Sequence, residues 1–165
     1  MIQQLDTDTV RMRMDAPPEA VYALVADVTR TPEFSPEVRR CTWLDGATGP
    51  AVGARFEVVN KAGRGPAWKN RPLVIVADRG REFAFSRTEK AAGTLVWRYR
   101  FEPVGDGTRV TESYEVTEPI TRLGWFIIGG LYGLKDRRAD LRSGMQLTLE
   151  QLRRTAEQTV QFPGR

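Results

Sequence analysis

Alternating apolar and polar side chains dominate the middle of the chain. Successive residues of a strand point to opposite faces of a sheet, so every second residue shares a face. This alternation is clear at residues 9–14, and it predicts six further strands. We expect those strands at residues 38–44, 54–60, 68–77, 82–88, 94–102 and 108–116. Short turns rich in Gly, Pro and Asp separate them, which favours antiparallel hairpins.

Helical periodicity flanks this strand-rich region on both sides. Proline and Glu19 in the stretch 16–19 start a first helix, and residues 31–34 form a short second helical turn. The apolar stripe of the first helix is Val21, Leu24, Val25 and Val28. After Pro119 a long terminal helix is predicted. Its stripe contains Leu134, Leu141, Met145, Leu149 and Leu152.

The order of these elements predicts an α+β protein. A seven-stranded antiparallel sheet has one face to cover, and the C-terminal helix is the only predicted element long enough to cover it. We therefore expect one domain over residues 1–165, with the sheet curved around the long C-terminal helix and two short helices between the first two strands. An apolar pocket can remain between helix and sheet. Residues 158–165 are expected to form a loose tail.

Composition excludes several kinds of site. Histidine is absent, which excludes a Ser-His-Asp triad, a Cys-His dyad and His-ligated metal or haem. The single cysteine, Cys41, excludes an internal disulfide and a Cys-cluster zinc site, and we expect it to be buried and inert. We expect no metal and no cofactor. Arginines are spread along the chain without a dense basic patch, so nucleic acid is not an expected partner. The first residues lack a signal-peptide pattern, so a cytoplasmic protein is expected.

Glu112 occupies a position where an apolar residue is expected. In the last predicted strand, Val110, Tyr114 and Val116 share its face, while the opposite face carries polar residues. A carboxylate on the apolar face needs a partner, a cavity or a shifted pKa. Alternation places Arg87 on the same face, and we predict that it is the counter-ion of Glu112.

Further side chains are predicted to point into the same interior. The candidate ligand-binding set comprises Phe56, Asn60, Trp68, Asn70, Phe85, Arg87, Trp97, Tyr99, Glu112, Tyr114, Leu141 and Met145. Its aromatic members suit ordinary core packing and equally suit a flat or hydrophobic ligand. Its polar members suit a buried structural pair of Arg87 with Glu112, or groups that orient a ligand or act on it. Contact with Arg87 would disfavour Glu112 as a general base, because it would stabilise the carboxylate.

Several short motifs, in this order and spacing, resemble one known superfamily. They are APPEAVY at 16–22 with Asp27 ending the helix, VGARF at 52–56, GREFAF at 80–85, WRYRFEP at 97–103, GTRVTES at 107–113, GMQ at 144–146 and LEQL at 149–152. The chain resembles the START-related superfamily, and more closely its bacterial polyketide cyclase/dehydrase and lipid-transport-like members. The resemblance implies a helix-grip fold. It implies no single activity, because this fold hosts lipid carriers, receptors and cyclases.

Three functions follow from these patterns. The first is binding of a hydrophobic small molecule, lipid-like or aromatic, between sheet and terminal helix. The second, which the resemblance implies, is an enzyme of cyclase or dehydratase type, in which Glu112 and Tyr114, with Arg87 and Asn60, perform acid–base chemistry on a polyketide-like substrate.

The third function depends on the apolar run at residues 123–134. This run is too short to span a bilayer. It predicts the buried start of the terminal helix, a lid with glycine hinges, or a patch for weak membrane contact or homodimer formation.

Overall fold

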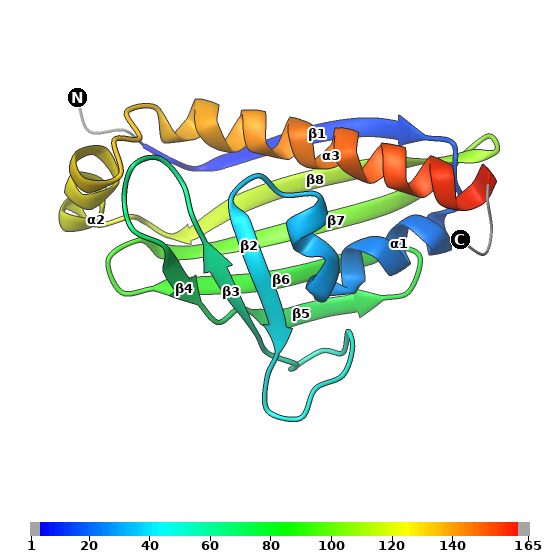
Figure 1. Ribbon diagram of the computed structural model, residues 1–165, viewed down its shortest axis with the longest axis horizontal. Helices are drawn as coiled ribbons and strands as arrows, with labels where there is room; N and C mark the ends of the chain where they lie inside the picture. Colours follow the sequence, from blue (N-terminus) through cyan, green and yellow to red (C-terminus); the bar gives the residue numbers. More distant parts are fainter. Residues whose placement is uncertain (1–3, 162–165) are drawn as a thin grey trace.

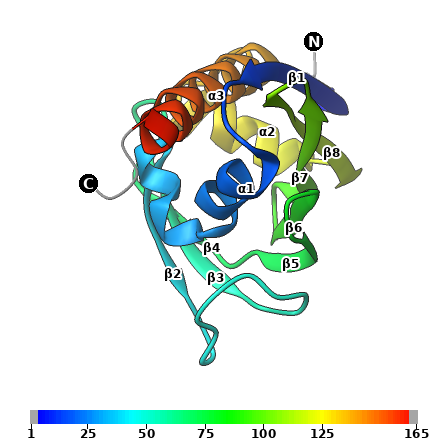
Figure 2. The same cartoon turned by 90° about the vertical axis from the view of Figure 1, so that its right-hand side faces the viewer.

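Two antiparallel sheets and one long helix surround a common interior. The computed structural model describes residues 4–161. The larger sheet has five strands in the order β1-β8-β7-β6-β5, and the smaller sheet has three in the order β2-β3-β4. Viewed end-on, the larger sheet lies on one side, the smaller sheet on the other, and α3 (Arg137–Gln161) crosses the top (Figure 2). The α+β prediction with a long C-terminal helix is confirmed.

The strands follow one another with short connections. Their bounds are β1 (Thr7–Met14), β2 (Val38–Trp43), β3 (Phe56–Asn60), β4 (Trp68–Asn70), β5 (Leu73–Asp78), β6 (Glu82–Glu89), β7 (Gly93–Val104) and β8 (Gly107–Glu118). β7 and β8 are the longest strands and lie at the centre of the larger sheet. α3 (Arg137–Gln161) packs mainly over β1, at the edge of this sheet, and over part of β8.

Residues 4–161 form eight strands where seven were predicted. The expected strand at 68–77 is divided into β4 and β5, which belong to different sheets. Pro72 lies at the break, where it lacks an N–H and restricts the preceding residue. The sheets remain joined there, because Phe56 N donates to Pro72 O (3.3 Å) and Val74 N to Ala54 O (2.9 Å). The interior is thus enclosed by two sheets instead of one curved sheet.

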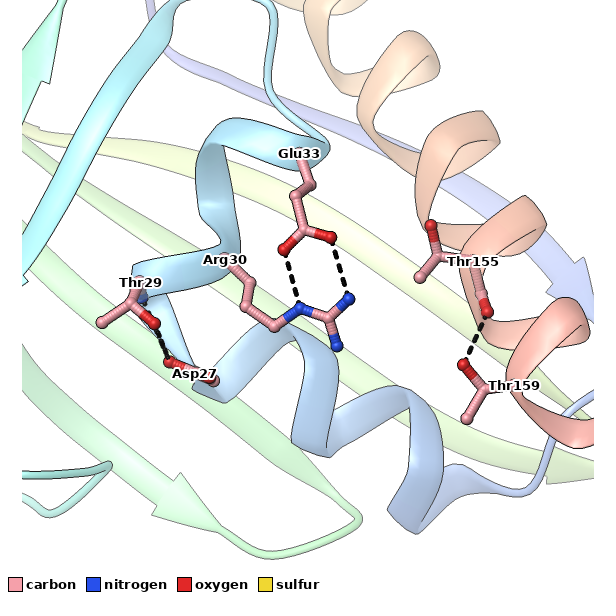
Figure 3. A network of polar contacts seen from close by, with 6 residues as sticks. All are labelled: Asp27, Thr29, Arg30, Glu33, Thr155 and Thr159. Carbon is pink, nitrogen blue, oxygen red and sulfur yellow. Dashed lines mark hydrogen bonds and ion pairs between the residues drawn. The ribbon is translucent and has the colours of Figure 1, made fainter. Parts of the chain in front are cut away.

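Two short helices fill the gap between β1 and β2, as predicted. They are α1 (Pro18–Ala26) and the 3₁₀ helix η1 (Val28–Glu33). Asp27 ends α1, and its Oδ1 accepts the backbone N–H of Thr29 at 3.2 Å. The same oxygen accepts the Thr29 hydroxyl at 2.5 Å (Figure 3). Within η1, Arg30 forms a two-point ion pair with Glu33, at 2.7 and 2.8 Å. These local bonds stabilise the turn of η1, and the buried side chain of Val28 packs it on the interior.

The long helix α3 packs its apolar stripe on the sheets. Leu149, Leu152 and Ala156 are fully buried, and Met145 and Leu141 are nearly so. Its last turn reaches Gln161, where Thr159 Oγ1 donates to the Thr155 carbonyl at 2.9 Å (Figure 3). The loose tail expected from residue 158 is therefore helical as far as Gln161, and residues 162–165 lie outside the described part. In the described residues 4–161, no helix is long and apolar enough to cross a membrane.

The apolar run before α3 forms a separate unit. It comprises the short helix α2 (Arg122–Phe126) and the π-helical turn η2 (Ile127–Leu131). α2 lies at the end of the molecule, beyond the first turn of α3 (Figure 1). The run leads into α3, but the prediction that it forms the start of the terminal helix is wrong, because α3 begins at Arg137 and Gly133, with φ +70°, lies between.

Candidate functional site

A mostly apolar cavity of about 130 Å³ lies between the two sheets and α3. The apolar lining from the strands includes Phe56, Val58, Phe83, Phe85 and Trp97. The helices contribute Val25, Val28, Leu141, Met145 and Leu152. We call this space the inner cavity. Its walls are core residues, so the site is held by the same packing that stabilises the fold.

Glu112 lines the inner cavity from the centre of β8. Its side chain is only 3% exposed. Glu112 lies directly opposite Tyr99 of β7, and the Tyr99 hydroxyl donates a hydrogen bond to Glu112 Oε1 at 2.7 Å. The second carboxyl oxygen, Oε2, is buried and has no hydrogen-bond partner among residues 4–161. Oε1 is therefore fixed by a hydrogen bond, whereas the hydrogen-bonding capacity of Oε2 is unsatisfied.

Burial changes the protonation of this pair. It raises the pKa of Glu112 to about 8, and the hydrogen bond from Tyr99 opposes that rise only in part. Burial raises the pKa of Tyr99 as well, with a further contribution from the Glu112 charge. At neutral pH, Glu112 is therefore mostly an uncharged carboxylic acid next to an uncharged phenol.

The predicted pairing of Arg87 with Glu112 is wrong. Arg87 instead pairs with Glu89 (Nη1 to Oε1, 3.2 Å), two residues further along the same face of β6. Arg87 lies opposite Leu95 of β7, whereas Glu112 lies opposite Tyr99. These two positions on β7 differ by four residues, which is about 13 Å along the strand. The two side chains share a face of the sheet but lie at different positions along the strands.

A second polar group lines the inner cavity at its other end. Asn60 and Asn70 are each 7% exposed, and Asn70 Nδ2 donates to Glu89 Oε1 at 2.9 Å. Three buried atoms of this group have no hydrogen-bond partner in the described part of the chain: Asn60 Nδ2, Asn70 Oδ1 and Arg87 Nε. Burial lowers the pKa of Arg87, and Glu89 opposes this shift. The two unpaired donors, Asn60 Nδ2 and Arg87 Nε, suit an oxygen atom of a ligand, whereas Asn70 Oδ1 suits a ligand donor.

A larger cavity of about 410 Å³ adjoins the first beneath α2 and η2. We call it the outer cavity. Trp68, Leu95, Ile127, Ile128 and Tyr132 contribute to its lining. Four residues line both cavities: Asn70, Arg87, Arg137 and Leu141. Arg137 is fixed there by two bonds to Glu37, at 2.5 and 2.9 Å.

Most of the candidate side chains line one of the two cavities. Phe56, Asn60, Phe85, Trp97, Tyr99, Glu112 and Met145 line the inner one, Trp68 lines the outer one, and Asn70, Arg87 and Leu141 line both. Tyr114 lines neither cavity. It is 1% exposed and packs against Trp97, with ring centroids 5.4 Å apart. Tyr114 is thus a core residue, and its position does not support the predicted acid–base role.

Sequence reasoning missed the contribution of the segment between β1 and β2. Thr31, Phe34, Ser35, Pro36 and Glu37 line the inner cavity, as does Cys41 of β2. Strand alternation gives no information about such loop and 3₁₀ residues. Cys41 is buried as expected, and burial raises the pKa of its thiol to about 11, which keeps it protonated. In the described residues, no group of three or more potential metal ligands comes together.

This architecture matches that of a known family. Residues 8–157 match the model of the family described as polyketide cyclase/dehydrase and lipid transport. The chain belongs to this family. No curated protein matches the chain significantly. A related solved structure is the polyketide-cyclase-like protein Cgl2372 from Corynebacterium glutamicum, which is 35% identical, with 95% of this chain and 94% of that chain covered and a TM-score of 0.62.

More distant members of the fold are also similar. A START superfamily protein from Mycobacterium smegmatis is 14% identical over 93% of this chain and 99% of its own, with a TM-score of 0.68. The di-domain ARO/CYC protein StfQ, from the steffimycin biosynthetic pathway, is 15% identical over 94% of this chain and 52% of its own, with a TM-score of 0.74. At such identities the similarity establishes the fold, which is the helix-grip fold. The family and fold support a role in binding or converting hydrophobic small molecules.

Proposed function

We propose that the protein binds an elongated, mostly apolar small molecule that carries an oxygen atom able to accept a hydrogen bond from Glu112. The observation that carries this proposal is Glu112 Oε2, a buried oxygen in a mostly apolar cavity without a partner in residues 4–161. Because Oε1 already receives the Tyr99 hydroxyl, the proton of the neutral acid resides on Oε2. A carbonyl, ether or hydroxyl oxygen of a ligand would satisfy it.

The cavity volumes support an elongated ligand. Drug-sized ligands occupy pockets of roughly 300–1,000 Å³. The inner cavity, at about 130 Å³, is smaller, whereas the outer cavity, at about 410 Å³, falls within this range. A ligand that reaches Glu112 would therefore extend past Arg87 and Leu141 into the outer cavity. Lipid-like molecules and aromatic polyketides have this combination of length, apolar surface and few oxygens.

Ligand titration with variants of Glu112 tests the proposal. The ligand is sought by native mass spectrometry of protein purified without detergent, and then titrated by fluorescence. Glu112→Gln keeps an N–H donor in place and should retain most of the affinity. Glu112→Leu should lose roughly tenfold or more, because the ligand oxygen is left unpaired.

Glu115→Leu is the matched control for this titration. Glu115 lies on the same strand but is exposed on the other face, so its replacement should not change the affinity. A ligand that binds Glu112→Leu as tightly as the wild type would contradict the proposed contact.

A second candidate is acid–base catalysis of the cyclase or dehydratase type. It is favoured by two observations: no arginine of residues 4–161 pairs with Glu112, and the pKa of Glu112 is about 8. Such a carboxyl can give a proton to a carbonyl oxygen and, once ionised, take one from an adjacent carbon. Glu112→Gln separates the two candidates. A binding protein keeps its ligand affinity in this variant, whereas an enzyme keeps its substrate affinity and loses turnover.

A further inference from the structure

Three large apolar side chains project into solvent from the short segment before α3. Leu123 is 62% exposed, Phe126 75% and Leu131 53%. We call these three residues the apolar tip. Only three other large apolar side chains are comparably exposed in residues 4–161: Val52, Leu147 and Val160. The apolar tip thus contains three of these six exposed side chains within nine residues, and such a concentration marks an interaction site.

Hydrogen bonds at both ends fix the position of the segment that carries the apolar tip. Thr121 Oγ1 accepts the N–H of Gly124 (3.1 Å), and Thr121 N donates to Ala91 O (3.1 Å). At the other end, Arg64 donates to the carbonyls of Tyr132 (3.1 Å) and Gly130 (2.8 Å). The exposure of the tip is therefore built into the fold and is not the result of a frayed end.

The segment has two different sides. Ile127, Ile128 and Tyr132 line the outer cavity. Leu123 and Phe126, on neighbouring turns, face solvent. In Figure 1, α2 lies at one end of the molecule, in agreement with the exposure of Leu123 and Phe126. The tip is thus separated from the outer cavity by the thickness of a single helical segment.

Positive charge surrounds the apolar tip. Arg122 and Lys135 are exposed in the same stretch of chain, and Arg138 is exposed in the first turn of α3. Two exposed cations from distant parts of the sequence also lie near the tip. Arg64 is hydrogen-bonded to the segment, and Lys90 is next to Ala91, whose carbonyl accepts from Thr121.

The acidic groups near the tip are fewer and already engaged. Glu118 accepts from Thr94 Oγ1 at 2.7 Å, and Asp136 accepts the N–H of Ala139 at 3.1 Å. Cations therefore predominate around the tip. This charge is complementary to an anionic surface.

We propose that the apolar tip docks on the surface of an anionic phospholipid bilayer. Leu123 and Phe126 enter the boundary between headgroups and acyl chains, and the surrounding Arg and Lys side chains contact lipid phosphates. A symmetric contact with a second copy of the chain is less favourable, because it brings the same cations together. Three side chains also present less area than a stable protein interface needs, about 800 Å² per partner. A bilayer has no such requirement for a matching surface.

Vesicle co-sedimentation tests this docking, independently of the proposed ligand. The wild type should bind vesicles of mixed phosphatidylglycerol and phosphatidylcholine, bind phosphatidylcholine vesicles weakly, and lose binding as salt rises. Leu123→Ser with Phe126→Ser should weaken binding by at least about tenfold. The matched control, Leu147→Ser with Val160→Ser, removes two exposed apolar groups from α3 (45% and 47% exposed) and should bind like the wild type.

A pair of charge reversals completes the test. Arg122→Glu should weaken binding to anionic vesicles, whereas Arg154→Glu makes the same charge change at an exposed position near the other end of α3 and should have a smaller effect. Circular dichroism confirms that each variant is folded. The proposal is wrong if the wild type does not sediment with anionic vesicles, or if both charge variants lose binding equally. It is also wrong if sedimentation velocity shows a dimer that the tip variant dissociates, because the tip is then a subunit interface.

Discussion

Tyr99 and Glu112 are direct partners across β7 and β8, joined by a hydrogen bond of 2.7 Å inside the molecule. The two groups differ in what remains available to them. The Tyr99 hydroxyl proton is committed to Glu112, whereas Glu112 retains one oxygen without a partner in the described chain. The pair thus presents a single, oriented carboxyl oxygen to the inner cavity. The following predictions start from this pair and extend to its surroundings.

The stability of the protein should depend on pH through Glu112. Its pKa is about 8 in the folded protein and about 4.5 in the unfolded chain, so the native state holds a proton that the unfolded state has released between these values. The stabilisation is fully present below the unfolded pKa and is lost as pH rises through 8. Over this window the free energy of unfolding should fall by up to about 1.4 kcal/mol per pH unit relative to Glu112→Gln. Urea denaturation of both proteins across the window measures it. If the free energies of unfolding of the two proteins varied with pH in parallel, the pKa of Glu112 would not be raised in the folded state.

Removing the Tyr99 hydroxyl should move the pKa of Glu112 upward. The hydrogen bond favours the ionised carboxylate, and Tyr99→Phe removes this contribution. The variant should also lose about 1 kcal/mol of stability. Carbon-detected NMR of labelled glutamate follows the titration directly. Tyr22→Phe, which changes another largely buried tyrosine, should leave this titration unchanged.

Glu89→Ala should destabilise the protein through Arg87. The pair is largely buried, with 17% of the Arg87 and 24% of the Glu89 side chain exposed, and Glu89 also holds Asn70. Loss of Glu89 leaves a desolvated guanidinium without this partner, at a cost of about 2–3 kcal/mol. The control is Glu19→Ala, because the Arg79–Glu19 pair is 80% and 70% exposed and should contribute less than about 0.5 kcal/mol. Equal losses of stability in urea denaturation would contradict the difference in burial.

Two glycines near the η2 segment should respond oppositely to alanine. A Cβ atom at Gly65 would lie 2.3 Å from the Tyr132 ring, so Gly65→Ala should cost about 1–3 kcal/mol and loosen the segment. A Cβ atom at Gly129 would meet nothing within 4 Å, so Gly129→Ala should be neutral or stabilise by up to about 1 kcal/mol. Thermal unfolding measures both effects. A strong loss of stability in Gly129→Ala would show that this turn needs the freedom of glycine.

Alternation along the strands correctly predicted which face of the sheet a side chain lies on. It did not predict which residues of neighbouring strands lie opposite one another. Glu112 and Tyr99 were both placed on the inner face, where the structure has them. Their pairing depends on the register between β7 and β8, which is set by the two-residue turn at Gly105 and Asp106 and which alternation alone does not give. The same limitation explains the error at Arg87, whose neighbours are set by the β6–β7 register.

Other differences arise from contacts between distant elements. Tyr114 faces inward as predicted, yet it packs in a cluster with Leu95, Leu141 and Met145 and does not reach either cavity. Thr31 and Glu37 line the inner cavity because η1 and the following loop fold over it, and these segments have no periodicity to interpret. Residue type and spacing thus predicted the layers of the fold. Which side chains meet inside it was decided by tertiary packing.

Electric charge is distributed unequally between the two adjoining cavities. In the described chain, the inner wall carries two cations, Arg87 and Arg137, and two carboxylates, Glu37 and Asp140, besides the neutral Glu112. The outer wall shares both arginines and adds Lys69 and Lys90, with Glu89 as its carboxylate. The electrostatic potential therefore becomes more positive from the inner cavity to the outer one. A molecule with one acidic and one uncharged end would be aligned by this gradient, with its acidic end toward Lys90 and its uncharged oxygen toward Glu112.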